Sequence, residues 1–383
     1  MVARRNDVTQ KIGIITFHRA LNYGAVLQAY ALCAFSNSIC NSSTSFEVID
    51  YRSRYFENLR YGIYGNNKLK SIARSLMYFI PTCKKRKGFD SFLKKITLSK
   101  KYNERSISST NAIFSKFITG SDQVFNQDCS GEDNAFLLSF VNQDNGKYSY
   151  AASVGKTEIT ENERSFLAKS LNSFQRVSIR EREGIDIVRE ILPEMPLRLD
   201  YDPVFLLKEK DWVRVANSHA LKKIGLKRKF VFLYCVFFDE KMLKTAIDFA
   251  REHGFDIVAI GIPKKALKKS DNIITADECG PSDWLHLMRM ATHVFTNSFH
   301  GLAFSLLFNK DFFVAHPTGE RGSKLTSRID NLLDKFAVKG RKLLMKNEYE
   351  YADYSKIDES KNSEIIDEII DYEKTYLCSI ISD

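Results

Sequence analysis

The chain has 383 residues, of which 44% are hydrophobic and 27% are charged, and its formal net charge at pH 7 is +10. This size and composition are typical of a globular protein with two domains, and they exclude collagen-like, low-complexity and repeat architectures. The basic excess favours anionic partners such as nucleic acid, a phospholipid surface or anionic metabolites.

The N-terminal half alternates between expected strands and helices. Residues 11–17 form a short, isoleucine-rich apolar run that is typical of a buried strand, and residues 25–35 carry helix formers at helical spacing. This order predicts a doubly wound α/β domain over residues 1–200. The other expected elements of this half are strands at 46–50, 114–120, 148–153 and 176–180 and a helix at 161–171.

Residues 52–105 interrupt this alternation as a basic insertion. Between positions 52 and 101, fourteen Lys and Arg residues stand against two acids. Two interpretations stay open: an amphipathic segment that rests on anionic headgroups, and a solvated basic lobe that covers a binding cleft. The apolar residues among these cations are Leu69, Ile72, Leu76, Met77, Phe79 and Ile80.

A boundary is expected around Pro203, between two alternating blocks. The second block begins with the apolar run 230–237, which is typical of a central strand covered on both faces. It predicts a second doubly wound domain over residues 208–345, followed by an acidic helical tail over 346–383. Its other expected elements are strands at 256–262, 272–276, 293–296 and 312–315 and helices at 240–252, 283–291, 301–308 and 328–336.

Two such α/β domains in tandem predict a glycosyltransferase-B-like architecture, in which two Rossmann-like domains face a cleft. Ligands of open α/β sheets bind beyond the carboxyl ends of the strands, so functional residues are expected directly after strands.

The seven cysteines contain no C-x-x-C pair, so neither disulfides nor a zinc site is expected. The N-terminal residues lack the apolar segment of a signal peptide. The longest apolar run, 230–238, is shorter than the ~20 residues of a membrane-spanning helix. These features predict a cytoplasmic protein.

The first polar cluster is the loop at 18–24, between the first strand and the first helix. Asn22, Tyr23 and Gly24 stand where the free N–H groups of a helix N-terminus favour an anion, and Gly24 would let the backbone approach a ligand. An ordinary turn between strand and helix explains the loop equally well.

The second cluster follows the strand that ends at residue 119. Ser121, Asp122 and Gln123 have side chains that could hold sugar hydroxyls, and Asp122 could act as a base. The alternative is a turn or an N-cap built from Asp and Ser.

Arg180 stands at the end of another strand, from which it would point toward the cleft. Its planar guanidinium suits bidentate binding of a phosphate or a carboxylate. A surface salt bridge is the alternative, and we favour that alternative for Arg182.

The stretch 296–301 follows a strand and opens a helix, and it contains the best acid–base candidate of the chain, His300. Ser298 and the backbone N–H groups behind it could bind phosphate at the helix N-terminus. His253, His286 and His293 lie at helix ends and are interpreted as structural.

Known cofactor motifs are absent from the sequence: no G-x-G-x-x-G, no P-loop, no H-E-x-x-H and no G-x-S-x-G is present. Asp200 and Asp202 have the D-x-D form that some sugar transferases use for a metal. Because Pro203 follows directly, we interpret this pair as the cap of an interdomain turn.

Together these clusters resemble the polysaccharide pyruvyl transferase family. The matching stretches keep the family's order and cover nearly all of residues 11–337. They are IGIITFHRALNYGAVLQAYAL (12–32), FITGSDQVFN (117–126), YAASVGK (150–156), VSIRE (177–181), DPVFLL (202–207), TNSFHGLAFSLLFNKDFFV (296–314) and SRIDNLL (327–333).

The resemblance implies two Rossmann-like domains that bind phosphoenolpyruvate as donor substrate, with no cofactor and no metal. It implies that His300 matches the family's cleft histidine and that Arg180 matches its anion-binding arginine. Some members carry an arginine where this chain has Ser298, so Arg328 or Arg321 is expected to supply the missing charge. The expected catalytic residues are His300, Arg180 and Asp122, and the expected substrate-binding residues are Asn22, Tyr23, Gly24, Ser121, Gln123, Asn297, Ser298, Phe299, Gly301 and Arg328.

The function that the resemblance implies is transfer of pyruvate from phosphoenolpyruvate to two hydroxyls of a sugar, as a ketal, in capsule or exopolysaccharide synthesis. The expected acceptor is a sugar, with a lipid-linked oligosaccharide as one form of it. Peripheral contact with the inner face of the membrane is one expectation, and no nucleic-acid partner is expected. The alternatives are a nucleotide-sugar-dependent glycosyltransferase and a non-catalytic protein that binds an anionic metabolite.

Overall fold

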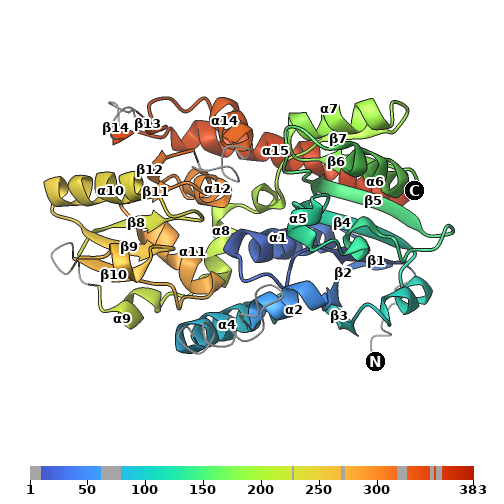
Figure 1. The fold of residues 1–383 in the computed structure, drawn as a ribbon, viewed down its shortest axis with the longest axis horizontal. Helices are drawn as coiled ribbons and strands as arrows, with labels where there is room; N and C mark the ends of the chain where they lie inside the picture. Colours follow the sequence, from blue (N-terminus) through green and yellow to red (C-terminus); the bar gives the residue numbers. More distant parts are fainter. Residues whose placement is uncertain are drawn as a thin grey trace. The chain divides into compact units, whose positions relative to one another are not determined.

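The computed structural model divides the chain into two compact units (Figure 1). The first unit comprises Met1–Leu207 and Ile369–Asp383, and the second comprises Lys208–Glu368. The structure describes residues 10–61, 79–226, 228–268, 272–316, 326–345, 349–350 and 356–383.

The first unit contains a parallel sheet of seven strands in the order β3-β2-β1-β4-β5-β6-β7. Its central strand β1 carries Ile12, Ile14 and Ile15, none of which is exposed. Because β1 pairs with β2 on one side and β4 on the other, the sheet reverses its direction of growth there. The strands are β1 (Gln10–Ile15), β2 (Thr44–Tyr51), β3 (Leu98–Tyr102), β4 (Lys116–Asp122), β5 (Gly146–Ala152), β6 (Val177–Ile179) and β7 (Leu197–Leu199).

The helices of the first unit begin at recognisable caps. Asn22 accepts a hydrogen bond from the backbone of Ala25 at the start of α1, and Thr160 forms a reciprocal capping box with Glu163 at the start of α6. The helices are α1 (Tyr23–Ile39), α2 (Arg54–Arg60), α4 (Phe79–Leu93), α5 (Gln127–Ser130), α6 (Glu161–Leu171) and α7 (Arg182–Ile191), with 3-10 turns η1 (Ile107–Ala112), η2 (Asn134–Leu137) and η3 (Pro203–Leu206).

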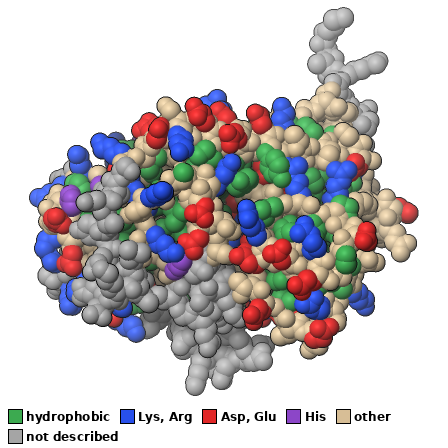
Figure 2. Space-filling model, turned by 90° about the horizontal axis from the view of Figure 1, so that it is seen from above, with side chains coloured by type: hydrophobic (Ala, Val, Ile, Leu, Met, Phe, Trp, Pro, Cys, Tyr) green, Lys and Arg blue, Asp and Glu red, His purple; other side chains and the backbone are tan. Residues whose placement is uncertain are grey.

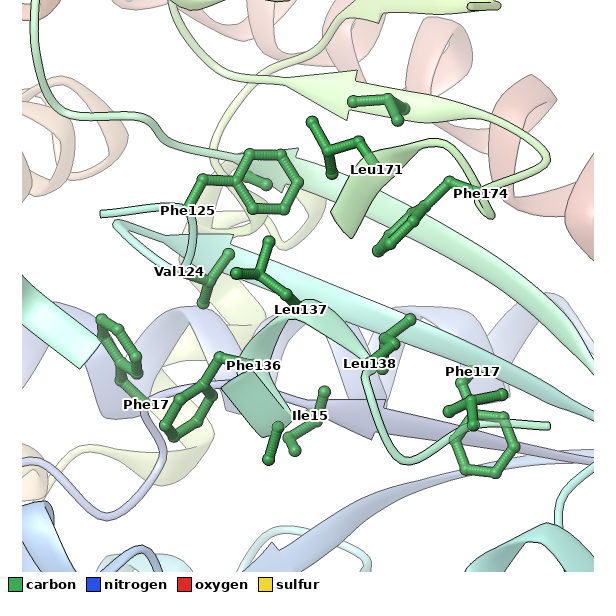
Figure 3. Close-up of a cluster of buried hydrophobic side chains, with 14 of the residues drawn as sticks. Ile15, Phe17, Phe117, Val124, Phe125, Phe136, Leu137, Leu138, Leu171 and Phe174 are labelled. Carbon is green, nitrogen blue, oxygen red and sulfur yellow. The ribbon is translucent and has the colours of Figure 1, made fainter. Parts of the chain in front are cut away.

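An aromatic cluster fills the core of the first unit beside the ends of its central strands (Figure 3). Phe17 and Phe136 pack edge to face with their ring centres 4.9 Å apart, and Phe125 lies edge to face with Phe174 at 6.4 Å. Phe17 follows β1 and Phe125 follows β4, so the loops that leave both strands are anchored in the core.

The second unit contains a parallel sheet of five strands in the order β10-β9-β8-β11-β12. Trp284 of α11 is fully buried, and its ring centre lies 5.2 Å from Phe304 and 5.4 Å from Tyr234, so it joins α11, α12 and β8. The strands are β8 (Phe230–Tyr234), β9 (Asp256–Ile260), β10 (Ile273–Thr275), β11 (His293–Thr296) and β12 (Asp311–Val314).

The helices of the second unit are α8 (Glu209–Val215), α9 (Ala220–Ile224), α10 (Glu240–His253), α11 (Pro281–Met290), α12 (Phe299–Leu307) and α14 (Thr326–Lys335), with the turn η4 (Lys264–Ala266). An antiparallel pair, β13 (Leu344–Met345) and β14 (Tyr349–Glu350), follows them. Asp239 caps the N-terminus of α10, and Gly254 ends that helix with φ +66°. Two parallel sheets, each wound outward from a central strand, confirm the expected pair of Rossmann-like domains.

Helix α15 (Glu359–Ser382) differs from the expected separate tail, because each of the two units contains part of it. In the second unit the amide of Asn362 donates to the carbonyl of Leu306 at 3.3 Å. In the first unit the hydroxyl of Tyr376 donates to the carbonyl of Ser149 at 2.9 Å. The apolar face of the helix continues past Ile370 to Ile380, which is why its last turns pack on the first sheet.

The apolar part of the basic insertion lies almost entirely outside the described residues. This holds for Leu69, Ile72, Leu76 and Met77, whereas Phe79 begins α4. None of the helices in the described ranges combines the length and apolarity needed to span a bilayer. On the face that Figure 2 shows, basic and acidic side chains of the described residues are interspersed.

Candidate functional site

In each sheet, a buried threonine hydroxyl ties together the two strands at which the sheet changes direction. In the first unit, Thr16 donates to the carbonyl of Ser121 at 3.0 Å, which links the ends of β1 and β4. In the second unit, Thr296 donates to the carbonyl of Tyr234 at 2.8 Å, which links the ends of β11 and β8. Ligands of such sheets bind beyond these strand ends, so the residues that follow are the candidates.

Asp122 ends β4 in a left-handed backbone conformation with φ 78°, which an L-residue adopts at a cost of roughly 1–2 kcal/mol. The surroundings hold it there, because its carbonyl accepts from the backbone of Ser153 at 2.9 Å and from that of Val124 at 2.8 Å. Its carboxylate accepts from the backbone of Gln123 at 2.9 Å and stays partly exposed. A strained and partly exposed carboxylate at a strand end is typical of a functional position.

The loops after β4 and β5 are in close contact through Gln123 and Gly155. The side-chain oxygen of Gln123 accepts from the amide of Asn126 at 3.1 Å, and a Cβ on Gly155 would lie only 2.1 Å from that oxygen. Gly155 also has φ +65°, a conformation that glycine adopts without strain. The side chain of Gln123 is therefore engaged within its own loop.

Glu181, which sequence reasoning missed, holds the loop after β5. Its side chain is almost fully buried, and one carboxylate oxygen accepts from the backbone of Val154 at 2.7 Å and from that of Gly155 at 3.1 Å. Its position directly after β6 was the only signal in the sequence.

Arg180 is buried and paired, which differs from the expectation of a guanidinium directed at an anionic ligand. Only 3% of its side chain is exposed, and it donates to the carboxylate of Asp202. Burial alone would lower the pKa of Arg180, but the carboxylates of Asp202, Asp122 and Glu181 raise it above its ordinary value. Arg180 therefore stays a cation and is balanced inside the protein.

Asp202 joins three parts of the first unit. Besides Arg180 it binds the hydroxyl of Ser121 at 3.2 Å, and its other oxygen accepts from the backbone of Val204 at 3.1 Å. The expected cap is present at the start of η3, and the ion pair with Arg180 is an additional role. Ser121 itself is fully buried between these groups.

The loop at 18–24 presents one of its three expected residues to solvent. Asn22 is exposed and caps α1, whereas Gly24 is buried in the first turn of that helix. Tyr23 is 2% exposed, and its ring centre lies 5.2 Å from that of Phe89. Tyr23 and Gly24 therefore pack inside the unit.

In the second unit, the expected residues gather at the N-terminus of α12. Ser298 is the N-cap, and its hydroxyl accepts from the backbone of Gly301 at 3.3 Å. A Cβ on Gly301 would lie 2.2 Å from the hydroxyl oxygen of Thr296, so only glycine fits there. The first turn of α12 therefore lies directly against the end of β11.

Asn297 links β11 to the loop that follows β8. Its side-chain oxygen accepts from the backbone of Val236 at 2.9 Å, and its amide donates to the carbonyl of Phe237 at 2.6 Å. Only 1% of the residue is exposed. Asn297 therefore fixes a loop at the site.

Phe299 and His300 form the first turn of α12 with partly exposed side chains. Their rings are nearly perpendicular with centres 5.3 Å apart, and the guanidinium carbon of Arg328 lies 5.9 Å from the centre of the Phe299 ring. Helix α14 thus brings Arg328 to the helix N-terminus that carries Ser298. Arg321, the other expected cation, lies outside the described residues.

His316, which sequence reasoning also missed, follows β12 at the same edge of the sheet. The backbone of Ala315 donates to the carbonyl of Thr296 at 2.9 Å, so His316 emerges beside the loop that carries Ser298. Its Nε2 lies 2.9 Å from a carboxylate oxygen of Asp330, which also accepts from Lys342 at 3.0 Å.

Burial alone would raise the pKa of Asp330, but the hydrogen bonds from His316 and Lys342 lower it below the ordinary value. Asp330 is therefore ionised at neutral pH and orients the imidazole. Among the residues that the structure describes, no group of three or more His, Cys, Asp and Glu side chains is arranged to hold a metal ion.

The family model of the polysaccharide pyruvyl transferases matches residues 22–315, which is most of the chain. The chain belongs to the polysaccharide pyruvyl transferase family. The matched range contains both sets of strand-end residues, from Ser121 to Arg180 and from Asn297 to His300. No curated protein matches its sequence.

Solved structures with low sequence identity resemble this chain, and those with TM-scores of 0.50 and above show its fold. A UDP-GlcNAc 2-epimerase from Methanocaldococcus jannaschii is 11% identical, with a TM-score of 0.50 over 94% of this chain and 93% of that chain. The S. aureus MnaA–UDP co-structure is also 11% identical, with a TM-score of 0.52 over 96% and 90% of the two chains. The E. coli ADP-heptose lps heptosyltransferase II is 10% identical, with a TM-score of 0.42 over 95% and 100%. The fold is glycosyltransferase-B-like, as the sequence predicts.

Proposed function

We propose that the protein transfers the pyruvate part of phosphoenolpyruvate onto two hydroxyls of one sugar, forming a cyclic ketal and releasing inorganic phosphate. The observation that carries this proposal is the family match, because its range contains His300 at the N-terminus of α12, beyond the end of a central strand. An acid–base group beside a helix N-terminus suits an anionic substrate whose carbon must be protonated.

The second unit would bind the donor. Phosphoenolpyruvate carries a phosphate and a carboxylate, and the first turn of α12 offers backbone N–H groups and the positive end of the helix dipole. Arg328 stands beside Phe299, and His316 and Lys342 share Asp330 at the same edge. Arg328 would supply the charge of the arginine that some members carry at the position of Ser298.

The chemistry assigned to His300 is proton donation. His300 would donate a proton to the methylene carbon of phosphoenolpyruvate, so that C2 becomes electrophilic. One sugar hydroxyl would form a bond to C2 and lose its proton. The bond between C2 and the phosphate oxygen would then break, and a second hydroxyl would form the second bond to C2. Of the two hydroxyl protons, one restores His300 and the other leaves with phosphate.

The first unit would bind the acceptor. Asp122 would accept the proton of the attacking hydroxyl, since its carboxylate is partly exposed, and would pass that proton to the departing phosphate. Arg180 would act indirectly, because its guanidinium is bound by Asp202 and holds the strand ends around Asp122 in place. The acceptor that we propose is a sugar in a capsule or exopolysaccharide repeat unit, with a lipid-linked oligosaccharide as one form of it.

The test is phosphate release from phosphoenolpyruvate with a panel of p-nitrophenyl glycosides and lipid-linked oligosaccharides. We expect release that depends on an acceptor, and we expect His300→Ala to lower kcat by about 10²–10⁴-fold, as for loss of a general acid. His219→Ala, which removes an exposed histidine from the same unit, is the matched control and should leave the rate unchanged.

Two results would overturn the proposal. The first is binding of a nucleotide diphosphate sugar with no phosphate release from phosphoenolpyruvate for any acceptor, which would establish a glycosyltransferase. The second is binding of phosphoenolpyruvate without turnover, equally in wild type and in His300→Ala, which would establish a binding protein.

We also propose that the basic insertion brings the enzyme to an anionic membrane surface. Washing isolated membranes with high salt tests this, because an enzyme held by charge is released when salt screens the attraction. Absence of the enzyme from the membrane fraction at low salt would contradict the proposal.

A further inference from the structure

Two carboxyl side chains are buried against each other at the end of β7, and they come from distant parts of the sequence. Glu373 of α15 is fully buried and Asp200 is 2% exposed, and a carboxylate oxygen of Glu373 accepts from the backbone N–H of Tyr201, the residue that follows Asp200. Two buried carboxyl groups this close in the fold do not both ionise readily, because burial and the charge of the neighbour each favour the neutral form of one of them. We therefore expect the pair to hold one proton.

The two carboxyl oxygens of Glu373 fasten α15 to the first sheet. One oxygen accepts from the backbone N–H of Tyr201 at 2.7 Å, and the other accepts from the hydroxyl of Tyr150 at 2.8 Å. Every contact of this carboxyl group is thus made inside the first unit, to β5 and to the segment that follows β7.

Asp200 is held equally firmly from the other side. It accepts from the hydroxyl of Ser178 on β6 and from the guanidinium of Arg198 on β7. Arg198 in turn lies 3.9 Å from the ring centre of Tyr372 and 5.2 Å from that of Tyr376, both on α15. Arg198 therefore binds Asp200 and packs on the turn of α15 that carries Glu373.

A second ionisation would place two negative charges beside this one guanidinium. Burial and then the neighbouring Asp200 raise the pKa of Glu373 well above its ordinary value, and burial raises that of Asp200 as well. The other ionisable groups around the pair do not offset the second charge. They are Tyr150, Tyr372, Tyr376 and Asp202, which add no positive charge, and Arg176, which is paired with Asp383.

The same segment of chain carries part of the candidate site. Tyr201, whose backbone Glu373 holds, lies between Asp200 and Asp202, and Asp202 binds Arg180 and Ser121 at the end of β4. We propose that Glu373 is a positioning residue of this site: through the proton that it shares with Asp200, it fixes residues 200–202 and so the Asp202–Arg180 pair. The proposal rests on the proposed function only in taking this pair as part of the substrate site.

The pH dependence follows from the direction of the pKa shifts. The folded chain binds one proton that the unfolded chain releases near the ordinary pKa of a carboxyl group. Stability from this pair is therefore fully present below that ordinary pKa and is lost as pH rises toward the raised pKa of the pair. One proton changes the equilibrium constant of unfolding by at most about tenfold per pH unit.

The variant that tests this is Glu373→Gln, because a carboxamide accepts from Tyr201 and donates to Asp200 without a titrating proton. Glu364→Gln is the matched control, because Glu364 is an exposed carboxylate on the same helix. Urea unfolding of the full chain between pH 5.5 and 9 should show wild type and Glu364→Gln losing stability with rising pH, up to that limit. The stability of Glu373→Gln should fall less with pH, and the difference in slope should correspond to one proton.

Two further readouts test the positioning role. Amide hydrogen exchange of residues 197–207 should accelerate in wild type relative to Glu373→Gln as pH rises, since repulsion between two ionised carboxylates would move Glu373 away from the Tyr201 amide. The alkaline limb of phosphate release should shift to higher pH in Glu373→Gln, with kcat affected more than KM. Asp200→Asn, which removes the shared proton from the other side, should reproduce the flattened stability profile.

Each contrary result would contradict a different part of the proposal. Equal pH dependence of unfolding in wild type, Glu373→Gln and Asp200→Asn overturns the shared proton. If the pH dependence of unfolding flattens but hydrogen exchange at 197–207 does not change, Glu373 does not position residues 200–202. Its role would then be limited to holding α15 on the first unit. Absence of phosphate release in wild type contradicts the proposed function alone, because unfolding and exchange do not depend on activity.

Discussion

Asp122 ends β4 and Gly155 lies in the loop after the neighbouring strand β5, and both have positive φ. Gly155 has φ +65°, and the side chain of Gln123 also occupies the place that a Cβ would take, so both facts require glycine there. Asp122 has φ 78° because two backbone amides hold its carbonyl, although its own side chain disfavours that conformation. The strain at Asp122 therefore directs a carboxylate outward from a rigid turn.

The first prediction concerns Asp122→Asn. Asparagine tolerates the left-handed conformation and can accept from the backbone of Gln123, so the free energy of unfolding should change by less than about 1 kcal/mol. The loss of a base should lower kcat for phosphate release about 10²–10⁴-fold. Unfolding in urea and steady-state kinetics measure the two quantities. Full activity in Asp122→Asn would remove Asp122 from the reaction.

The second prediction concerns acid stability and Asp50, which ends β2. Burial alone would raise its pKa, but the His18 imidazole, whose Nε2 lies 3.6 Å from the carboxylate, and a hydrogen bond from Arg52 lower it from 3.8 to about 2. A lowered pKa gives stability that is present above 3.8 and lost as pH falls through about 2, and this interval corresponds to about 2 kcal/mol. Urea midpoints between pH 4.5 and 2 should therefore fall more steeply in wild type than in Asp50→Asn.

The control for Asp50 is Asp144→Asn, which replaces an exposed carboxylate of the same unit. Its acid profile should follow that of wild type. Parallel profiles in wild type and Asp50→Asn would show that the contact of Asp50 with His18 adds nothing to stability.

At the scale of elements, each site is built from a strand end and a neighbouring loop. In the second unit, Asn297 holds the loop after β8 while Ser298 caps α12. In the first unit, Glu181 holds the loop after β5 while Asp202 caps η3. In both units, buried polar side chains fix the backbone on which the exposed groups stand.

The third prediction concerns Asn297→Ala. The substitution leaves the backbone N–H of Val236 and the carbonyl of Phe237 without their partner, which costs about 1–3 kcal/mol. Hydrogen exchange at Val236 should accelerate more than exchange in β8 itself. Asn142→Ala, at an exposed position of the first unit, should leave both exchange and stability unchanged. Unchanged exchange at Val236 in Asn297→Ala would contradict this role.

Sequence patterns predicted the central strands of both sheets and missed the edges of the first one. β11 (His293–Thr296) and α6 (Glu161–Leu171) lie at their predicted residues, because both have clear apolar patterns or caps. β3 (Leu98–Tyr102) and β7 (Leu197–Leu199) were missed because edge strands with exposed Lys and Arg lack an apolar run. α7 (Arg182–Ile191) was missed because the charged residues of its exposed face stand between the apolar residues of its buried face along the sequence.

The candidate site was predictable as a set of positions but not as a set of contacts. Asp122 ends a strand, and Arg180 and His300 follow strands, as the topology requires. The pairing of Arg180 with Asp202, the hold of Glu181 on Gly155 and the pairing of His316 with Asp330 depend on which strands are neighbours. That order is a tertiary property, and spacing along the chain does not contain it.

At the scale of the whole molecule, helix α15 is divided between the two units. Residues up to Glu368 belong to the second unit, and the last turns belong to the first. Tyr376, Leu377 and Ile380 are at most 3% exposed, so the first unit owes part of its core to residues far from the rest of it in sequence.

The fourth prediction concerns deletion of residues 369–383. Exposing several buried apolar side chains at roughly 1.5–3 kcal/mol each approaches the whole stability of a domain, roughly 5–15 kcal/mol. Both tryptophans, Trp212 and Trp284, lie in the second unit, so their fluorescence should stay native-like while hydrogen exchange shows β4 and β5 unprotected. Native protection of β5 in the truncated chain would contradict the prediction.

The arrangement of α15 also sets an order of events during synthesis. A ribosome completes residues 208–368, and with them all of the second unit, before it adds the residues that cover the sheet of the first unit. The first unit therefore begins to form first and is completed last. Until then Tyr150 and the apolar surface around it are exposed to solvent. A nascent chain of this protein therefore exposes an apolar face of its first sheet, which chaperones would have to cover.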